Sequence, residues 1–196
     1  MRTLVLASRS TGRAELLARS GVPFLIDASE CDESTGLTDP AAHVQSLAQR
    51  KARQVAARYA DAVVIGADTA IDLDGEILGQ PGCDEEAEQM LTRLAGREHQ
   101  LLTGLAIVDS GTAMEYVGVE RTTVHMRDLT AVQIRAYVAS TEPKGKSGSY
   151  EIQGLGATII DRIEGDFSNV VGLPMAHLAR VLERFGVDLL TVVPRG

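Results

Sequence analysis

The chain has 196 residues, of which 44% are hydrophobic, 23% charged and 4% aromatic, and these proportions exclude a disordered, collagen-like or low-complexity protein. Its 27 acidic and 19 basic residues give a net charge of −8 at pH 7. This charge repels nucleic-acid backbones and anionic membranes, so we expect neither as a partner. A small anionic ligand remains compatible with it, because such a ligand needs only a locally positive pocket.

The N-terminus and the cysteines favour a cytoplasmic protein. Arg9 and Arg13 interrupt the apolar N-terminal residues, which argues against a signal peptide and a membrane span. Cys31 and Cys83 form neither a metal-binding pair at ligand spacing nor a disulfide framework. No stretch has the composition of a linker, so we expect a single domain over residues 1–196.

The first half of the chain alternates short apolar runs with helical patterns. An Asp-Gly pair between two short apolar runs indicates a two-residue hairpin turn, and an Asp-Pro pair indicates the start of a helix. The predicted elements are strands at 3–7, 22–27 and 62–67, a helix at 13–20, a long helix that starts at Asp39-Pro40, and a hairpin that pairs 71–73 with 76–78.

The second half continues the alternation. We predict helices at 85–95, 131–138 and 174–185, strands at 101–108, 116–127 and 157–163, and a glycine-rich loop over 140–156. Because crossover helices and hairpins are both present, the sequence predicts an α/β fold with a central mixed β-sheet and flanking helices.

Lys51 breaks the pattern of the long helix. It lies four residues after Leu47 and four before Val55, so it falls on the apolar stripe. One interpretation is a lysine at the edge of the stripe that extends its ammonium group to solvent. The other is a cation directed into a pocket, where it would bind phosphate.

Asp68 and Thr69 directly follow the predicted strand 62–67. In open α/β sheets, ligands bind beyond the carboxyl ends of the strands. A carboxylate at that place can hold a metal ion or take a proton from water. The alternative is a turn aspartate that accepts hydrogen bonds from its own backbone.

The loop Glu142–Gly156 carries four glycines together with Lys144 and Lys146. Turned-out backbone amides and two cations would suit contact with phosphate, although a solvated surface loop has the same composition. Gly145-Lys146-Ser147 is not the end of a P-loop, because Ser140 stands where that motif requires its first glycine.

Several motifs, taken in order, resemble those of the Maf family of nucleoside triphosphate pyrophosphatases. Each motif is weak alone, but the ordered set extends over nearly the whole chain. The motifs are LASRSTGRAELL from Leu6, Cys31-Asp32-Glu33, Arg50-Lys51-Ala52, Gly66-Ala67-Asp68-Thr69, Gly79-Gln80-Pro81, GSYEIQGLGA from Gly148 and NVVGLP from Asn169.

The resemblance implies a function and a fold. The function would be hydrolysis of a nucleoside triphosphate between its α- and β-phosphates, giving a monophosphate and pyrophosphate, in order to remove non-standard nucleotides. The fold would be similar to that of inosine triphosphate pyrophosphatases, with two lobes and a cleft. The resemblance also implies a divalent cation, Mg²⁺ or Mn²⁺, and a homodimer.

Roles for individual residues also follow from the resemblance. Asp68 matches the proposed general base, and Glu33 and Asp68 would share the metal ion. The positions that match substrate-binding ones are Ser8, Arg13, Glu33, Lys51 and Gln80. Such a set suits the reaction, because phosphoryl transfer is catalysed mainly by positioning and by neutralisation of charge.

Three positions bear on the choice of base. Thr69 and Gln153 match the branch similar to dTTP/UTP pyrophosphatases, and an amide can both donate to and accept from the imide edge of a pyrimidine. Gly12 replaces an arginine that helps to set specificity in that branch, and Gln80 replaces a phosphate-binding lysine. These two departures leave an alternative, a nucleotide-binding regulator of cell division with weak or no turnover.

Overall fold

The computed structural model describes residues 2–191. Its strands are β1 (Thr3–Leu6), β2 (Leu25–Ile26), β3 (Ala62–Leu73), β4 (Glu76–Leu78), β5 (Glu98–Asp109), β6 (Glu115–Met126) and β7 (Ile160–Glu164). Its α-helices are α1 (Thr11–Arg19), α2 (Pro40–Ala56), α3 (Asp84–Leu94), α4 (Ala131–Ala139), α5 (Phe167–Val171) and α6 (Met175–Glu183). Two short 3₁₀ helices are η1 (Ser147–Ser149) and η2 (Gly154–Thr158).

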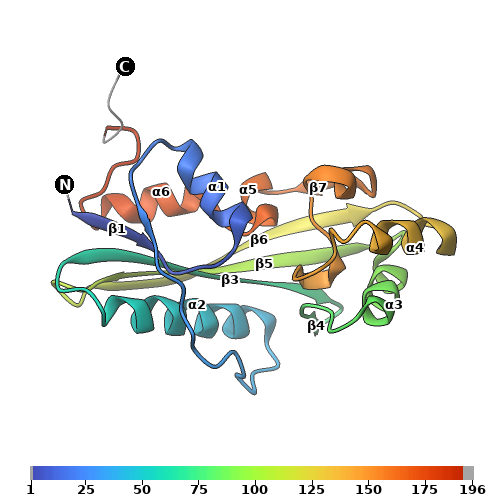
Figure 1. The fold of residues 1–196 in the computed structure, drawn as a ribbon, viewed down its shortest axis with the longest axis horizontal. Helices are drawn as coiled ribbons and strands as arrows, with labels where there is room; N and C mark the ends of the chain where they lie inside the picture. The colour runs from blue at the N-terminus through green and yellow to red at the C-terminus, as the bar shows by residue number, and fades with distance from the viewer. Residues whose placement is uncertain (1, 192–196) are drawn as a thin grey trace.

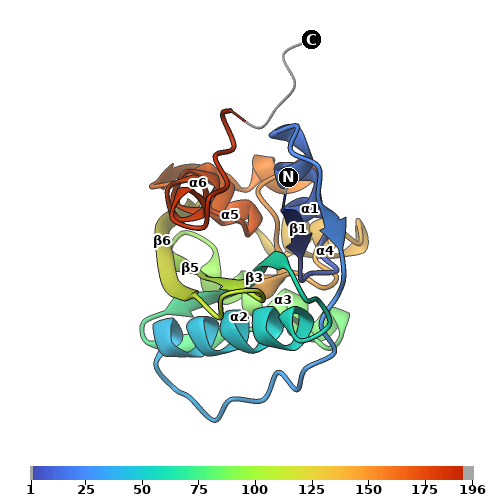
Figure 2. The same cartoon turned by 90° about the vertical axis from the view of Figure 1, so that its left-hand side faces the viewer.

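All strands belong to one mixed sheet, as the sequence predicts. The order is β2-β1-β3-β5-β6-β7, and β4 pairs with β3. β1 runs parallel to β2 and β3, while the other pairs are antiparallel. Figures 1 and 2 show α2 on one face of this sheet and α1, α5 and α6 on the other.

Two groups of apolar side chains cover the sheet near β1, one on each face. Alternate residues of β3 point to opposite faces: Ile65 belongs to the same cluster as Leu178 of α6, whereas Val64 belongs to the same cluster as Ala52 of α2. A separate cluster at the far end of β3 packs Ile71 against α3 and α4. The predicted strand 62–67, covered on both faces, is confirmed.

The long helix α2 begins as its sequence predicts. The Asp39 side chain accepts a hydrogen bond from the Ala42 backbone N–H at 2.7 Å, and Pro40 occupies the first turn. Its apolar stripe is buried, with the members Val44, Leu47, Ala48, Ala52, Val55 and Ala56. The hairpin turn at Asp74-Gly75 is also confirmed, with φ of 56° and 87° at these residues.

The prediction that Asp68 and Thr69 follow the end of a strand is wrong. β3 continues to Leu73, because β5 pairs with it without interruption from Val63 to Asp72. On its other edge β3 pairs with β1 only as far as Ile65, and with β4 only from Ile71. We call this interval, residues 66–70, the edge gap. The strand end that creates it is that of β1.

Other boundaries also differ from the predictions. The predicted strand 22–27 is reduced to Leu25–Ile26, and the strand predicted at 157–163 begins at Ile160 because η2 takes up the residues before it. Sequence analysis missed α5 entirely, since five residues are too few for a helical period to appear. Within residues 2–191, no helix is both long and apolar enough to cross a membrane.

Backbone contact between α2 and the sheet gives a prediction on stability. A Cβ added at Gly66 would collide with the Ala48 carbonyl oxygen and would lie 2.8 Å from the Ala52 nitrogen. We expect Gly66→Ala to lower the free energy of unfolding by roughly 3 kcal/mol in a urea titration, because helix backbone cannot move aside as a flexible side chain can.

Gly79→Ala is the matched control for this substitution. A Cβ at Gly79 meets nothing within 4 Å, so we expect a change below about 0.5 kcal/mol. Equal stability of the two variants would contradict the close packing of α2 on β3.

Candidate active site

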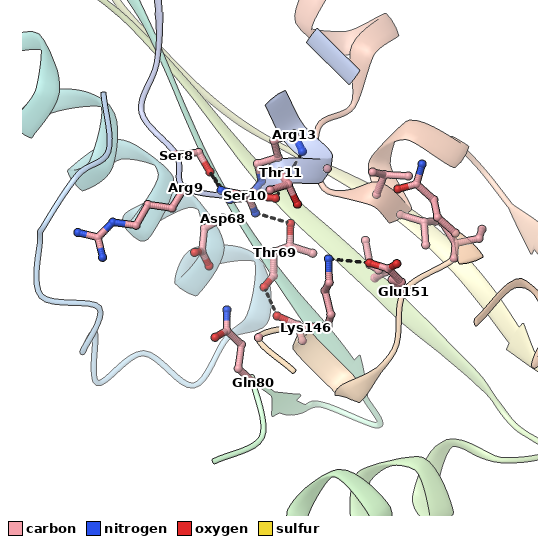
Figure 3. Close-up of a pocket in the computed structure, with 18 of the residues that line it drawn as sticks. Ser8, Arg9, Ser10, Thr11, Arg13, Asp68, Thr69, Gln80, Lys146 and Glu151 are labelled. Atoms are coloured by element: carbon pink, nitrogen blue, oxygen red, sulfur yellow. Dashed lines mark hydrogen bonds and ion pairs between the residues drawn. The ribbon is translucent and has the colours of Figure 1, made fainter. Parts of the chain in front are cut away.

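A cavity of about 420 Å³ opens at the edge gap (Figure 3). It lies between two apolar clusters of the core. Ala7 of the cluster near β1 and Leu101 of the cluster at the far end of β3 both line it. All residues that sequence analysis assigned to a site line this cavity, namely Ser8, Gly12, Arg13, Glu33, Lys51, Asp68, Thr69, Gln80 and Gln153.

Arg13 is held on three sides. It lies in the first turn of α1, whose cap is Ser10. Its Nε donates to the Gly172 carbonyl at 2.8 Å, Nη1 to Ser8 Oγ at 3.2 Å and Nη2 to Thr69 Oγ1 at 2.9 Å. A guanidinium has five N–H donors, so two remain for a ligand once these three are used. Burial lowers the pKa of Arg13, and the charges of Asp68 and Glu33 oppose that effect.

Lys51 lines the cavity, as the second interpretation expects of its position, and phosphate binding by it stays a prediction. Nζ lies 2.6 Å from Asp68 Oδ1 and 3.0 Å from Glu33 Oε1. The side chains of Lys51 and Asp68 are only 12% and 11% exposed, whereas that of Glu33 is 62% exposed. The ammonium group therefore joins an inner carboxylate to one at the mouth of the cavity.

No group of three or more His, Cys, Asp or Glu side chains within residues 2–191 is arranged to hold a metal ion. The two carboxylates predicted to bind one, those of Glu33 and Asp68, both contact Lys51 Nζ and are thus within reach of a single cation. Mg²⁺ in proteins commonly takes one or two carboxylates and completes its shell with water and substrate phosphates. The donor set fits that pattern.

The loop after α4 contacts the edge gap. Ser147 Oγ donates to the Thr69 carbonyl at 2.7 Å, and the Gly148 amide donates to the Gly79 carbonyl at 2.9 Å. Lys146 Nζ lies 2.6 Å from Glu151 Oε2, and both side chains line the cavity (Figure 3). The loop is thus anchored inside the gap, at Thr69, and just after β4, at Gly79, and it presents a lysine to the cavity.

Two of the predicted specificity positions are neighbours. A Cβ placed at Gly12 would lie 3.2 Å from Val171 Cγ1 and 4.0 Å from Gln153 Oε1. A larger residue at position 12 would therefore have to displace Val171. The third position, Thr69, instead bonds Arg13 and Thr103.

Sequence analysis missed the buried threonine beneath this site. Thr103 of β5 has no exposed surface, and its Oγ1 lies 3.0 Å from Thr69 Oγ1. A signal was present, because Thr103 is the one hydroxyl residue in the run 101–108, which is otherwise apolar or glycine. The significance of this hydroxyl becomes clear only from the register of β3 and β5, which sets Thr69 opposite Thr103.

The cavity collects positive charge in an acidic chain. The cations that line it are Arg9, Arg13, Lys51, Lys144 and Lys146, and the carboxylates are Glu33, Asp68 and Glu151. This local excess contrasts with the net charge of −8 for the whole chain. It fits the sequence-based expectation of a pocket for a small anion.

The fold and the cavity together define an α/β protein with a cation-lined cleft at a sheet edge. The same fold occurs in the Ham1 protein of Staphylococcus aureus, with a TM-score of 0.50 and 16% identity over 81% of this chain and 80% of that one. The family model described as Maf-like protein matches residues 3–185. The chain belongs to the Maf family, which confirms the assignment made from its motifs.

Relatives with higher sequence identity match nearly the whole chain. A dTTP/UTP pyrophosphatase of Moorella thermoacetica is 50% identical over 190 residues, covering 96% of this chain and 98% of that protein. One of Symbiobacterium thermophilum is 47% identical over 97% of this chain and 98% of that protein. One of Bacillus cereus is 44% identical over 96% of this chain and 98% of that protein.

The charge cluster at Lys51 yields a prediction on stability. Lys51→Met removes the counter-ion of the buried Asp68, and we expect the free energy of unfolding to fall by roughly 3 kcal/mol at pH 7. The double variant Lys51→Met/Asp68→Asn should recover part of that loss, because it leaves no unpaired carboxylate buried.

The control is Arg93→Met, which removes an exposed partner of Glu76 and should change unfolding little. A double variant as unstable as Lys51→Met alone would show that packing, and not charge, explains the loss.

Proposed function

We propose that this protein hydrolyses the α–β phosphoanhydride of a pyrimidine nucleoside triphosphate, dTTP or UTP, to the monophosphate and pyrophosphate. The observation that carries the proposal is the convergence of Arg13, Lys51 and Asp68 on one cavity. Its support from sequence is 44–50% identity, over nearly the full chain, to proteins named dTTP/UTP pyrophosphatase.

The cations of the cavity suit the triphosphate. Arg13 offers two N–H donors of a guanidinium that its other three bonds hold in place. Lys51 adds a point charge beside Asp68. Attack on the α-phosphorus transfers negative charge to the departing pyrophosphate, and fixed cations stabilise that charge without reorganising.

Asp68 is the proposed general base. Its Oδ1 accepts a hydrogen bond from Lys51, which leaves Oδ2 to take a proton from water. The oxygen of that water attacks the α-phosphorus, and the bond from this phosphorus to the oxygen that bridges it to the β-phosphorus breaks. Pyrophosphate leaves with the electron pair of the broken bond. The proton stays on Asp68 until the monophosphate departs.

A divalent cation, Mg²⁺ or Mn²⁺, is part of the proposal. Glu33 and Asp68 would hold it, and it would supply neutralising charge to the phosphates. Lys51 Nζ lies within 3.0 Å of a carboxylate oxygen of each of these residues. The ammonium group would therefore also lie beside phosphates bound to that cation.

The missing lysine at Gln80 has a candidate substitute. Lys146 and Gln80 line the same cavity, and Lys146 is paired with Glu151 at 2.6 Å. We propose that Lys146 exchanges Glu151 for phosphate when the triphosphate binds. Charge neutralisation then does not depend on position 80, which favours turnover over a regulator that only binds nucleotide.

The apolar end of the cavity suits the base. Its lining includes Leu101, Tyr150, Ile152 and Val170, with Gln153 and Gly12 nearby. An apolar wall with one amide that can both donate and accept matches the flat ring and the imide edge of thymine or uracil.

The cytoplasmic location and the homodimer implied by the family stay predictions. Sedimentation velocity of the purified protein at micromolar concentration tests the second. A monomer at every concentration would contradict it.

A substrate panel tests the reaction itself. Purified protein with Mg²⁺ or Mn²⁺ is given common and modified triphosphates, and pyrophosphate and orthophosphate are assayed separately. We expect pyrophosphate, chiefly from dTTP and UTP. Pyrophosphate from purine nucleotides alone would overturn the base preference, and tight binding without product would support the regulator.

The role of Asp68 gives a prediction on catalysis. Asp68→Asn keeps the shape of the side chain but cannot take the proton, so we expect kcat to fall by roughly 10²-fold or more while the triphosphate still binds. Asp72→Asn on the same strand lies outside the cavity and should keep the activity. Near-normal turnover in Asp68→Asn would assign the base elsewhere.

The role of Gln153 gives a prediction on specificity. Gln153→Glu removes the N–H donor and adds a negative charge at the base end, so we expect kcat/KM for dTTP to fall at least about tenfold relative to that for dGTP, whose base edge donates two N–H groups. Gln89→Glu makes the same change of charge on the exposed surface of α3 and should leave the ratio unaltered. An unchanged ratio in Gln153→Glu would exclude Gln153 from base selection.

A further inference from the structure

A chain of hydrogen bonds leads from Arg13 into the protein interior. Arg13 Nη2 donates to Thr69 Oγ1 at 2.9 Å, and Thr69 Oγ1 lies 3.0 Å from Thr103 Oγ1. Thr103 Oγ1 in turn donates to the Asn169 carbonyl at 3.2 Å. Thr103 is fully buried and does not line the cavity, so nothing bound there can touch it.

The direction of each proton in this chain follows from its two ends. A hydroxyl has one proton to donate, and Thr103 gives its proton to the Asn169 carbonyl. The bond between the two threonines must then be donated by Thr69. Since the Thr69 proton points inward and one of its lone pairs accepts from Arg13, Thr69 has no proton left for a nucleotide.

Both ends of the network meet α5 and the residue that follows it. Asn169 lies within α5 and accepts from Thr103, while Gly172 ends the helix with a φ of 112° and accepts from Arg13 Nε. A Cβ at Gly172 would lie 3.2 Å from Arg13 Nε and 3.3 Å from Thr69 Oγ1, so the backbone closes tightly over the guanidinium. Arg13 is thereby fixed in direction as well as in place.

We propose that Thr103 is a positioning residue for the reaction, which acts through Thr69 to aim the guanidinium of Arg13 at the phosphates. Thr69 then serves the phosphate end of the substrate and does not read the base as a donor. This inference rests on the proposed function. It assigns a role to a residue outside the cavity and gives Thr69 a different role from the one implied by its motif.

A double-mutant cycle with Arg13 tests the proposal. Thr103→Val keeps the shape of the side chain but removes the hydroxyl, so we expect kcat/KM for dTTP to fall roughly 10- to 100-fold through misplacement of the guanidinium. In the Arg13→Ala background the same substitution should have no further effect, because nothing is left to aim. An equal loss in both backgrounds would show a merely structural role and would overturn the proposal.

Three more variants sharpen the test. Thr103→Ser restores the hydroxyl and should restore most of the activity, and Thr69→Val should lower kcat/KM for dTTP and for dGTP by the same factor. Thr123→Val, which removes a hydroxyl bonded to Gln100 away from the cavity, should leave kcat/KM unchanged. Wild-type activity in Thr103→Val, or a changed ratio of dTTP to dGTP in Thr69→Val, would overturn the proposal.

Failure of the proposed function can be told apart from failure of this inference. If the wild-type protein releases no pyrophosphate, the proposed function fails by itself. The cycle is then measured as Kd for the α,β-methylene analogue of dTTP by calorimetry. The same non-additivity is expected there, because binding also uses Arg13, and an additive result would overturn the positioning role.

Discussion

The edge gap of β3 is the constraint on which the site depends. On this edge β1 pairs with β3 as far as Ile65, and β4 pairs with it from Ile71. The backbone groups of β3 between these two residues therefore need other hydrogen-bond partners. The loop after α4 meets part of that need through Ser147, and so brings its lysines to the same place. The Asp68 carboxylate, although it lies inside a strand, is then both held by the sheet and open to the cavity.

The second determinant is how charge is distributed around that gap. An acidic surface would repel a triphosphate at long range, yet the five cations of the cavity wall outnumber its three carboxylates. Each of the innermost cations is also restrained, Lys51 by two carboxylates and Arg13 by three oxygens. Preorganised cations of this kind bind anions without first having to become ordered.

Much of the architecture could be predicted from local signals. The cap at Asp39, the turn at Asp74-Gly75 and the buried stripe of α2 all obey rules that involve only near neighbours. The extension of β3 through Asp68 and Thr69 could not be predicted from the pattern of apolar and polar residues. It results from pairing with β5, which the sequence alone does not show. The contact of Thr103 with Thr69 depends on the same pairing, whereas the motifs selected residues that all line one cavity without any knowledge of register.

The glycines beneath α2 have a consequence for how this protein can change. At Gly66 and Gly104 the helix backbone rests directly on the strands, with no side chain between to absorb a shift. Main-chain contact thus adds to side-chain packing in fixing the distance of α2 from the strand that carries Asp68. Substitutions on the outer surface of α2 leave this contact intact, whereas a shift of the helix along its axis would bring its backbone into collision with the strands. A different spacing between Lys51 and Asp68 would therefore require a new packing of α2 on the sheet.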